Sequence, residues 1–217
     1  MPIGDRPILD IIIRQLRRQG FDRITIASGY LAELVQAFFR DGSEYEVSID
    51  YHVERERLGT VGALKSIEGL ESEDAFLVMN GDVLTDLDYR ALRAAHLASD
   101  AVATIATFSR RVQISLGVMQ LDDPRDPARL TGYLEKPTYD YEVSMGVYCF
   151  SPRVLGYIEQ DAYLDLPDLV DKLLADGQVV RGFRFDGYWM DIGRHEDYEQ
   201  ATEEYEANRS RLLPDDQ

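Results

Sequence analysis

The chain has 217 residues, of which 45% are hydrophobic and 29% are charged, and its formal net charge at pH 7 is −17. This length is enough for one domain with a buried core. The acidic balance argues against nucleic acid as a partner, because phosphate backbones are bound by clustered Lys and Arg. No run approaches the roughly 18 apolar residues of a membrane helix, and the N-terminus has no signal pattern. The single cysteine, Cys149, suits a reducing compartment. The sequence therefore predicts a cytoplasmic protein that binds neither nucleic acid nor membrane.

The first half of the chain predicts strands that alternate with helices. The segment from Pro7 to Gln19 has the pattern of an amphipathic helix, with Pro in its first turn and Gly just past its end. Further helices are expected over residues 31–39, 61–67 and 89–99, and strands over residues 23–27, 47–52, 75–79 and 101–108. Such alternation implies a mostly parallel sheet with helices on both faces.

The pattern changes after residue 108. Strand candidates with short turns between them follow at 117–121, 130–134 and 146–150. Helices return at 152–158 and 166–175, before a strand at 179–185 and a final helix at 196–211. We therefore expect one α/β domain over residues 1–217, with a β-rich insertion between roughly residues 110 and 150.

Two aspartates each follow a predicted strand and have turn residues around them. Asp82 follows the apolar run that ends at Met79, and Asp191 follows the strand over residues 179–185. In open α/β sheets, ligands bind at the carboxyl ends of the strands. Two carboxylates there would repel each other by ~4 kcal/mol at 4 Å in an effective dielectric of 20. A shared Mg²⁺, which favours one or two carboxylates plus substrate phosphates, would relieve this repulsion. Either aspartate taken alone is better explained as the cap of a turn, and it is the two contexts together that favour a metal site.

Two weaker patterns carry glycines or a lysine. Gly59, Thr60 and Gly62 stand at a predicted helix start, where glycines let a ligand approach the backbone or simply form a turn. Glu135 and Lys136 follow a strand, where an exposed pair is ordinarily a surface ion pair worth at most ~1 kcal/mol.

Six segments, in this order and spacing, resemble the sugar-1-phosphate nucleotidylyltransferases, also called NDP-sugar pyrophosphorylases. They are residues 4–9, 20–24, 58–62, 80–82, 132–137 and 189–193. The resemblance implies a Rossmann-like fold of the nucleotide-diphospho-sugar transferase type. It also implies a nucleotide-binding half over residues 1–109, a sugar-binding half over 110–193, and a C-terminal helix and tail over 194–217.

The resemblance further implies the Mg²⁺-dependent transfer of a nucleotidyl group from an NTP to a sugar 1-phosphate, with release of pyrophosphate. Asp82 and Asp191 match the family's metal-binding aspartates, and Lys136 matches the lysine on the sugar phosphate. The positions on the nucleotide side are Gly59, Thr60, Gly62 and Gly81, and those lining the sugar pocket are Gly117, Glu135 and Gly146. A homo-oligomer is compatible with the sequence, which does not specify the nucleobase or the sugar.

One departure concerns the start of the chain. Family members begin with a strand and a G-x-G-T-R loop, followed by a Pro-Lys pair, and these hold the triphosphate. The segment Pro2-Ile3-Gly4 matches only the exit from that loop. We therefore expect the first strand to be missing and the chain as written to be impaired or inactive, since comparable arginines are worth ~10³–10⁵ in rate.

Two alternatives remain open at this point. One is a non-catalytic homologue that binds a nucleotide sugar or regulates another enzyme. The other is a glycosyltransferase-like sheet, for which Asp86 and Asp88 have the spacing of a D-x-D metal motif. Their place at a predicted helix start favours N-capping instead.

Overall fold

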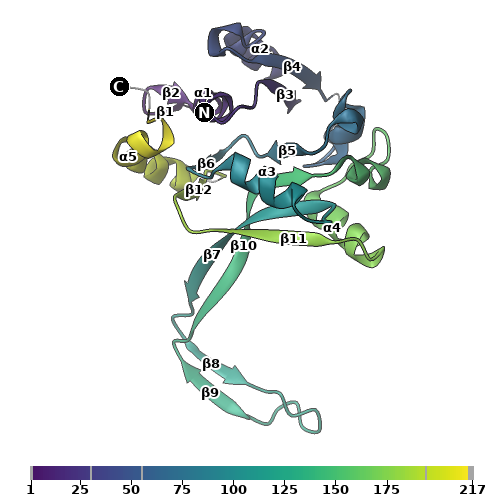
Figure 1. The fold of residues 1–217 in the computed structure, drawn as a ribbon. Coiled ribbons are helices and arrows are strands. Elements are labelled where there is room, and N and C mark those ends of the chain that lie inside the picture. The colour runs from purple at the N-terminus through teal and green to yellow at the C-terminus, as the bar shows by residue number, and fades with distance from the viewer. Residues whose placement is uncertain (1, 30, 55, 194, 215–217) are drawn as a thin grey trace.

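The computed structural model describes residues 2–29, 31–54, 56–193 and 195–214. It confirms the α/β class, with a four-stranded central sheet between helices (Figure 1). The strand order is β11 (Val180–Phe185), β7 (Ala103–Gln113), β10 (Thr138–Phe150) and β5 (Phe76–Met79). Strand β10 runs against the other three, so two of the three pairings are antiparallel. The sheet is therefore mixed, where the sequence predicted mostly parallel pairing.

The reversal of β10 follows from the connection that precedes it. Strand β7 leads into β8 (Gly117–Gln120) and β9 (Gly132–Glu135), which pair with each other as an antiparallel hairpin. A parallel neighbour requires a long crossover, usually through a helix, whereas a hairpin returns the chain antiparallel. The β-rich insertion expected from the sequence is thus what reverses the strand beside β7.

Strands β7 and β10 form a long ribbon that projects from the body and ends in the β8–β9 hairpin (Figure 1). The third strand, β11, accompanies this ribbon only as far as the pairing of Phe185 with Phe108. We call the two-stranded part beyond it, residues 109–142, the arm. The arm exposes a series of large apolar side chains: Val112, Ile114, Leu116, Met119, Leu121, Leu130, Tyr133, Leu134 and Tyr141.

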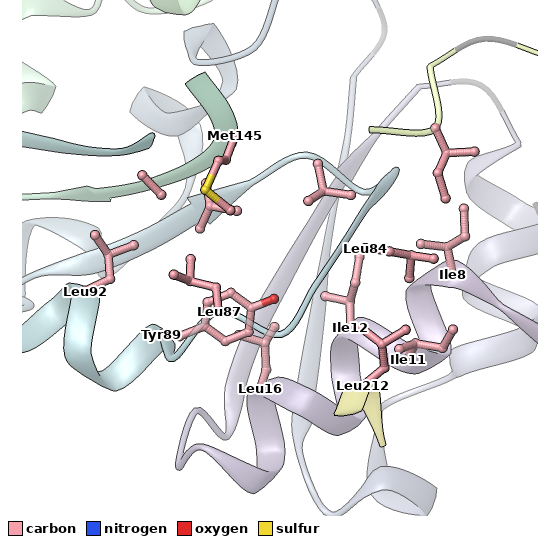
Figure 2. Packing of buried hydrophobic residues seen from close by; sticks show 14 of the residues in the cluster. Ile8, Ile11, Ile12, Leu16, Leu84, Leu87, Tyr89, Leu92, Met145 and Leu212 are labelled. Carbon is pink, nitrogen blue, oxygen red and sulfur yellow. The ribbon is translucent and has the colours of Figure 1, made fainter. Parts of the chain in front are cut away.

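One face of the sheet packs against α1 (Ile8–Arg18), α3 (Tyr89–Leu97) and α5 (His195–Leu212). Figure 2 shows Ile8, Ile11 and Ile12 of α1 beside Leu84 and Leu212, within the same buried cluster. The apolar spacing of α1 at positions 8, 11, 12 and 16 accounts for this packing, because these positions share one helical face.

The opposite face packs against α4 (Leu166–Ala175) and the 3₁₀ helix Pro152–Tyr157. Side chains of β10 alternate between the two clusters, since Val147 and Cys149 belong to the first and Tyr148 and Phe150 to the second. This two-sided burial explains why residues 147–150 are apolar without interruption.

A separate parallel pair, β3 (Arg23–Ser28) and β4 (Ser48–Val53), lies beside α2 (Ala32–Phe39). A cavity of about 1240 Å³ lies between β3 and β5 and is bounded on a third side by α1. Among the described strands, β3 pairs only with β4, and β5 pairs only with β10. Each therefore turns one backbone edge toward the cavity. The sequence-based expectation of a missing first strand stays a prediction.

Short elements account for the remaining differences from the sequence prediction. Two antiparallel pairs were not expected: β1 (Pro2–Ile3) with β2 (Arg6–Pro7), and β6 (Val83–Thr85) with β12 (Trp189–Asp191). The helices expected over 61–67 and 152–158 form as 3₁₀ helices, at Gly62–Ser66 in the first case. Further 3₁₀ turns cover 43–45 and 70–72. None of the helices in the described residues is long and apolar enough to span a bilayer.

Candidate active site

The two predicted metal-binding aspartates lie side by side because β6 pairs with β12. In this pairing Val83 is opposite Asp191, and the backbone N–H of Ile192 donates to the carbonyl oxygen of Asp82 at 3.0 Å. On the other side, the backbone N–H of Asn80 donates to the carbonyl oxygen of Gly146 at 2.9 Å. Backbone contacts from three distant parts of the chain therefore fix this end of the sheet.

The electrostatics of the aspartate pair are unfavourable without a counter-charge. Burial and the neighbouring Asp191 carboxylate raise the pKa of Asp82 above its ordinary value. Asp82 Oδ1 is buried and has no hydrogen-bond partner among the described residues. Asp191 is more exposed, and its Oδ1 accepts a hydrogen bond from the backbone N–H of Gly193 at 3.1 Å. An unpaired buried carboxylate oxygen costs free energy, so this site favours a cation.

This donor set fits Mg²⁺. Within the part of the chain that the structure describes, no group of three or more His, Cys, Asp or Glu side chains could hold a metal. The protein would therefore supply two carboxylates and leave the remaining positions to water and substrate phosphates. Mg²⁺ is commonly bound in this way, since it retains several waters and prefers oxygen ligands.

Gly146 packs against Asn80 and lies at a register shift between β10 and β7. Its φ is +74°, and a Cβ there would lie 2.9 Å from Asn80 Nδ2 and 3.2 Å from Val83 Cγ2. Only glycine combines this backbone conformation with such close packing. Gly146 thus supports the segment that carries Asp82.

The nucleotide-side positions divide between the cavity and the interior. Gly59, Thr60 and Gly81 line the cavity together with Asp82. A Cβ on Gly81 would meet no atom within 4 Å, so the space beside this residue is open. Gly62 is buried and is not among the lining residues.

The sugar-side positions on the arm lie close to one another. Gly117 is opposite Glu135 in the β8–β9 hairpin. The hydroxyl of Tyr133 donates to Glu135 Oε2 at 3.1 Å, and it lies where a Cβ on Gly117 would be, at 1.9 Å. The glycine therefore makes room for a tyrosine that holds the glutamate.

The structure does not bring these arm residues to Asp82 and Asp191. Lys136 follows β9 with φ +47°, a left-handed conformation that is uncommon for a non-glycine residue, and it is exposed without an ion-pair partner in the described chain. From Thr138 to Ser144, β10 advances about 20 Å at the usual rise per residue. Lys136 therefore lies at the far end of the ribbon, away from Asn80 and Gly146.

Glu54 and Asp165 are among the acidic residues that line the cavity and that the sequence analysis did not select. Asp165 precedes Leu166 and Pro167 at the start of α4, which is the pattern of an ordinary N-cap. Its contact with Thr60 spans 105 residues of sequence, so no local signal could have indicated it.

Comparisons with known proteins agree with the fold and with the family that the sequence resembles. A family described as "Nucleotidyl transferase" matches residues 1–208. The chain is 33% identical to the UTP–glucose-1-phosphate uridylyltransferase of Synechocystis sp., over 93% of this chain and 56% of that protein. It is 30% identical to a mannose-1-phosphate guanyltransferase of Candida albicans, over 98% of this chain and 59% of that protein. The chain thus spans less than two thirds of these curated relatives.

Two solved structures share the arrangement of the elements. HddC from Yersinia pseudotuberculosis superposes with a TM-score of 0.69 at 25% identity, covering 94% of this chain and 88% of that one. A putative glucose-1-phosphate thymidylyltransferase from Bacillus anthracis, in complex with a sucrose, gives a TM-score of 0.72 at 22% identity, over 94% and 84%. The second likeness concerns the fold alone.

Proposed function

This chain belongs to the nucleotidyl transferase family, and from that premise we propose that it transfers a nucleotidyl group from an NTP to a sugar 1-phosphate, with release of pyrophosphate. The observation that supports this most directly is the aspartate pair, in which Asp82 carries a buried oxygen without a partner in the described chain and has a raised pKa beside Asp191. The names of the two curated relatives, a uridylyltransferase and a guanyltransferase, support the same chemistry.

In this proposal Asp82 and Asp191 hold Mg²⁺ against the phosphates. The ion would neutralise phosphate charge and orient the α-phosphate for in-line attack. The nucleobase lies along Gly59 and Thr60, with the backbone packing of Gly62 behind them and the open space at Gly81 next to the nucleoside. Residues 1–109 thereby serve the nucleotide, and residues 110–193 serve the sugar.

The sugar 1-phosphate is bound by Lys136 through its phosphate and by Glu135 through its hydroxyl groups, with Gly117 and Gly146 lining the sugar pocket. A lysine acts on phosphate as a point charge and must approach closely. The arm therefore has to fold toward the aspartates when both substrates are present. Catalysis then consists of positioning and charge neutralisation, with no covalent intermediate on the protein.

The test is pyrophosphate release by the purified chain, measured with each of several NTPs against each of several sugar 1-phosphates in the presence of Mg²⁺. We expect release only when one NTP and one sugar 1-phosphate are supplied together, and we expect an NDP-sugar as the second product. Binding of an NDP-sugar without any pyrophosphate release would instead support a non-catalytic, regulatory role. Transfer of the sugar from an NDP-sugar to another acceptor would contradict the proposal.

A further inference from the structure

The loop of residues 58–62 is fastened to a distant segment, residues 162–165, which precedes α4. The backbone N–H of Val61 donates to the carbonyl oxygen of Leu164 at 3.1 Å, and the N–H of Leu164 donates to the carbonyl oxygen of Leu58 at 2.9 Å. These two bonds join the loop to the segment through both backbone groups of Leu164. The position of the loop is therefore set by a part of the chain about 100 residues away.

The two glycines of the loop allow this contact. A Cβ on Gly59 would lie 2.6 Å from the carbonyl oxygen of Leu164, and φ of Gly59 is +75°. A Cβ on Gly62 would lie 2.4 Å from the carbonyl oxygen of Ala162. Both distances are too short for a real side chain, so the glycines are required for packing of the loop on this segment.

Asp165 holds the centre of the loop. It occupies the N-cap position of α4, yet its side chain accepts no bond from the amides of that helix. Instead Oδ1 accepts from the backbone N–H of Thr60 at 3.0 Å and from the Thr60 hydroxyl at 3.2 Å, while Oδ2 accepts from the hydroxyl of Tyr163. The Tyr163 hydroxyl and then the Thr60 amide hold the pKa of Asp165 below its ordinary value. The carboxylate is therefore directed away from its usual capping role and toward the loop.

The same contacts show which ligand group the loop can accept. The N–H of Leu58 donates to Glu54 Oε2 at 3.1 Å, that of Thr60 to Asp165, and that of Val61 to a carbonyl. A glycine-rich loop that binds phosphate does so with free backbone N–H groups and positive potential. This loop has three of its amides engaged and a carboxylate on each side, so it disfavours an anion and suits an uncharged ring.

We propose that Asp165 is a positioning residue for the nucleobase: it holds Thr60 and Gly59 in the conformation that receives the ring, and acts through them. This inference rests on the proposed function for the identity of the ligand. Asp165 lines the same cavity as Thr60 and Asp82, so the contact between Asp165 and Thr60 lies on the nucleotide side of the site. Because it acts through the loop, Asp165 affects recognition of the base and leaves the phosphates and the sugar unaffected.

The experiment compares Asp165→Ala and Asp165→Asn with Asp168→Ala, a matched control that removes an exposed aspartate in the first turn of the same helix. We expect Asp165→Ala to raise KM for the NTP about tenfold, while kcat and KM for the sugar 1-phosphate stay within twofold. Asp165→Asn keeps an acceptor oxygen and should recover part of the loss. A fall in kcat with unchanged KM, or equal effects of Asp168→Ala, would overturn the assignment.

A second measurement does not depend on turnover. Calorimetric titration with uridine, guanosine and inorganic tripolyphosphate should show that Asp165→Ala weakens binding of at least one nucleoside about tenfold and leaves tripolyphosphate binding unchanged. If wild-type chain binds neither nucleoside, or if the variant binds them equally well, the positioning role is wrong. If wild-type releases no pyrophosphate but its nucleoside binding depends on Asp165, the proposed reaction fails and the positioning role stands.

Thr60→Val, which keeps the amide and removes the hydroxyl, replaces Asp165→Ala if that variant does not fold. A smaller loss of nucleoside binding is then expected.

Discussion

The two ends of the candidate site are built differently. At the body end, Asn80, Asp82, Gly146 and Asp191 come from three segments far apart in sequence, and backbone hydrogen bonds hold them together. At the arm end, Gly117, Glu135 and Lys136 lie within one hairpin, where Gly117 is opposite Glu135 and the Tyr133 hydroxyl donates to Glu135. Long-range packing makes the body end pre-organised. The geometry of the arm end relative to the aspartates is set only when the arm folds toward the body. Substitutions should therefore have different consequences at the two ends.

The largest expected effect is that of Asp82→Ala at the body end. Loss of one of two carboxylates should lower the rate of nucleotidyl transfer about 10³-fold, which corresponds to about 4 kcal/mol of charge stabilisation. It should also abolish the effect of Mg²⁺ on thermal unfolding. The measurement is the single-turnover rate across a Mg²⁺ titration, with Asp186→Ala as the control because Asp186 is an exposed aspartate that the proposal does not use. An unchanged Mg²⁺ dependence in Asp82→Ala would rule out its role as a metal ligand.

Replacing a glycine by alanine at each end should lower the free energy of unfolding by different amounts. Gly146→Ala introduces a Cβ against Asn80 at φ +74°, which should lower the free energy of unfolding by about 1–3 kcal/mol. Gly117→Ala meets the end of the Tyr133 side chain on the exposed arm, and this side chain can rotate, so the loss should be below ~1 kcal/mol. Urea unfolding of both variants makes the comparison. Equal losses would mean that the arm is packed as tightly as the body.

Lys136→Ala tests whether the arm reaches the site. The apparent KM for the sugar 1-phosphate should rise about tenfold or more, which corresponds to ~1.4 kcal/mol of binding. The KM for the NTP should change little. Arg110→Ala is the control, since it removes an exposed cation from the same ribbon. If both variants raise KM for the sugar 1-phosphate equally, Lys136 contributes only general positive charge, and its assignment to the sugar phosphate is wrong.

The smallest effect should come from the apolar surface of the arm. Leu116 is 71% exposed, so Leu116→Ala should change the free energy of unfolding by less than about 0.5 kcal/mol. Chemical unfolding at low and high protein concentration provides the measurement. A loss above ~1 kcal/mol would show that the arm is covered in solution, either by the body or by another copy of the chain.

The sequence predicted the main strands and helices because their patterns are local. Residues 75–79 are continuously apolar, and α1 has a clear helical period, so both could be identified without the fold. The β6–β12 pair was not predicted, because three residues per strand give no measurable alternation. The length of the β7–β10 ribbon was also missed, since residues 109–113 are largely polar and exposed and do not follow the pattern of a half-buried strand.

The candidate site could be predicted only in part, for a related reason. Asp82 and Asp191 were selected because each follows a predicted strand with turn residues around it. The structure brings them together, and their role as metal ligands stays a prediction. Asp165 could not be found, because its pattern is that of an N-cap and its partner Thr60 lies 105 residues away. The arrangement of Lys136 relative to the aspartates depends on how the arm is oriented, which no residue pattern encodes.

The cavity between β3 and β5 has a consequence for how the molecule opens. Where the chain is described, strands β3 and β4 form a sheet of only two strands, and such a pair is marginally stable unless it packs on something else. Its packing comes through a small cluster in which Ile13 of α1 meets Phe39, Val47 and Ile49. Amide hydrogen exchange along residues 23–53 should therefore proceed through a local opening of lower free energy than global unfolding, ahead of exchange in β7 and β10.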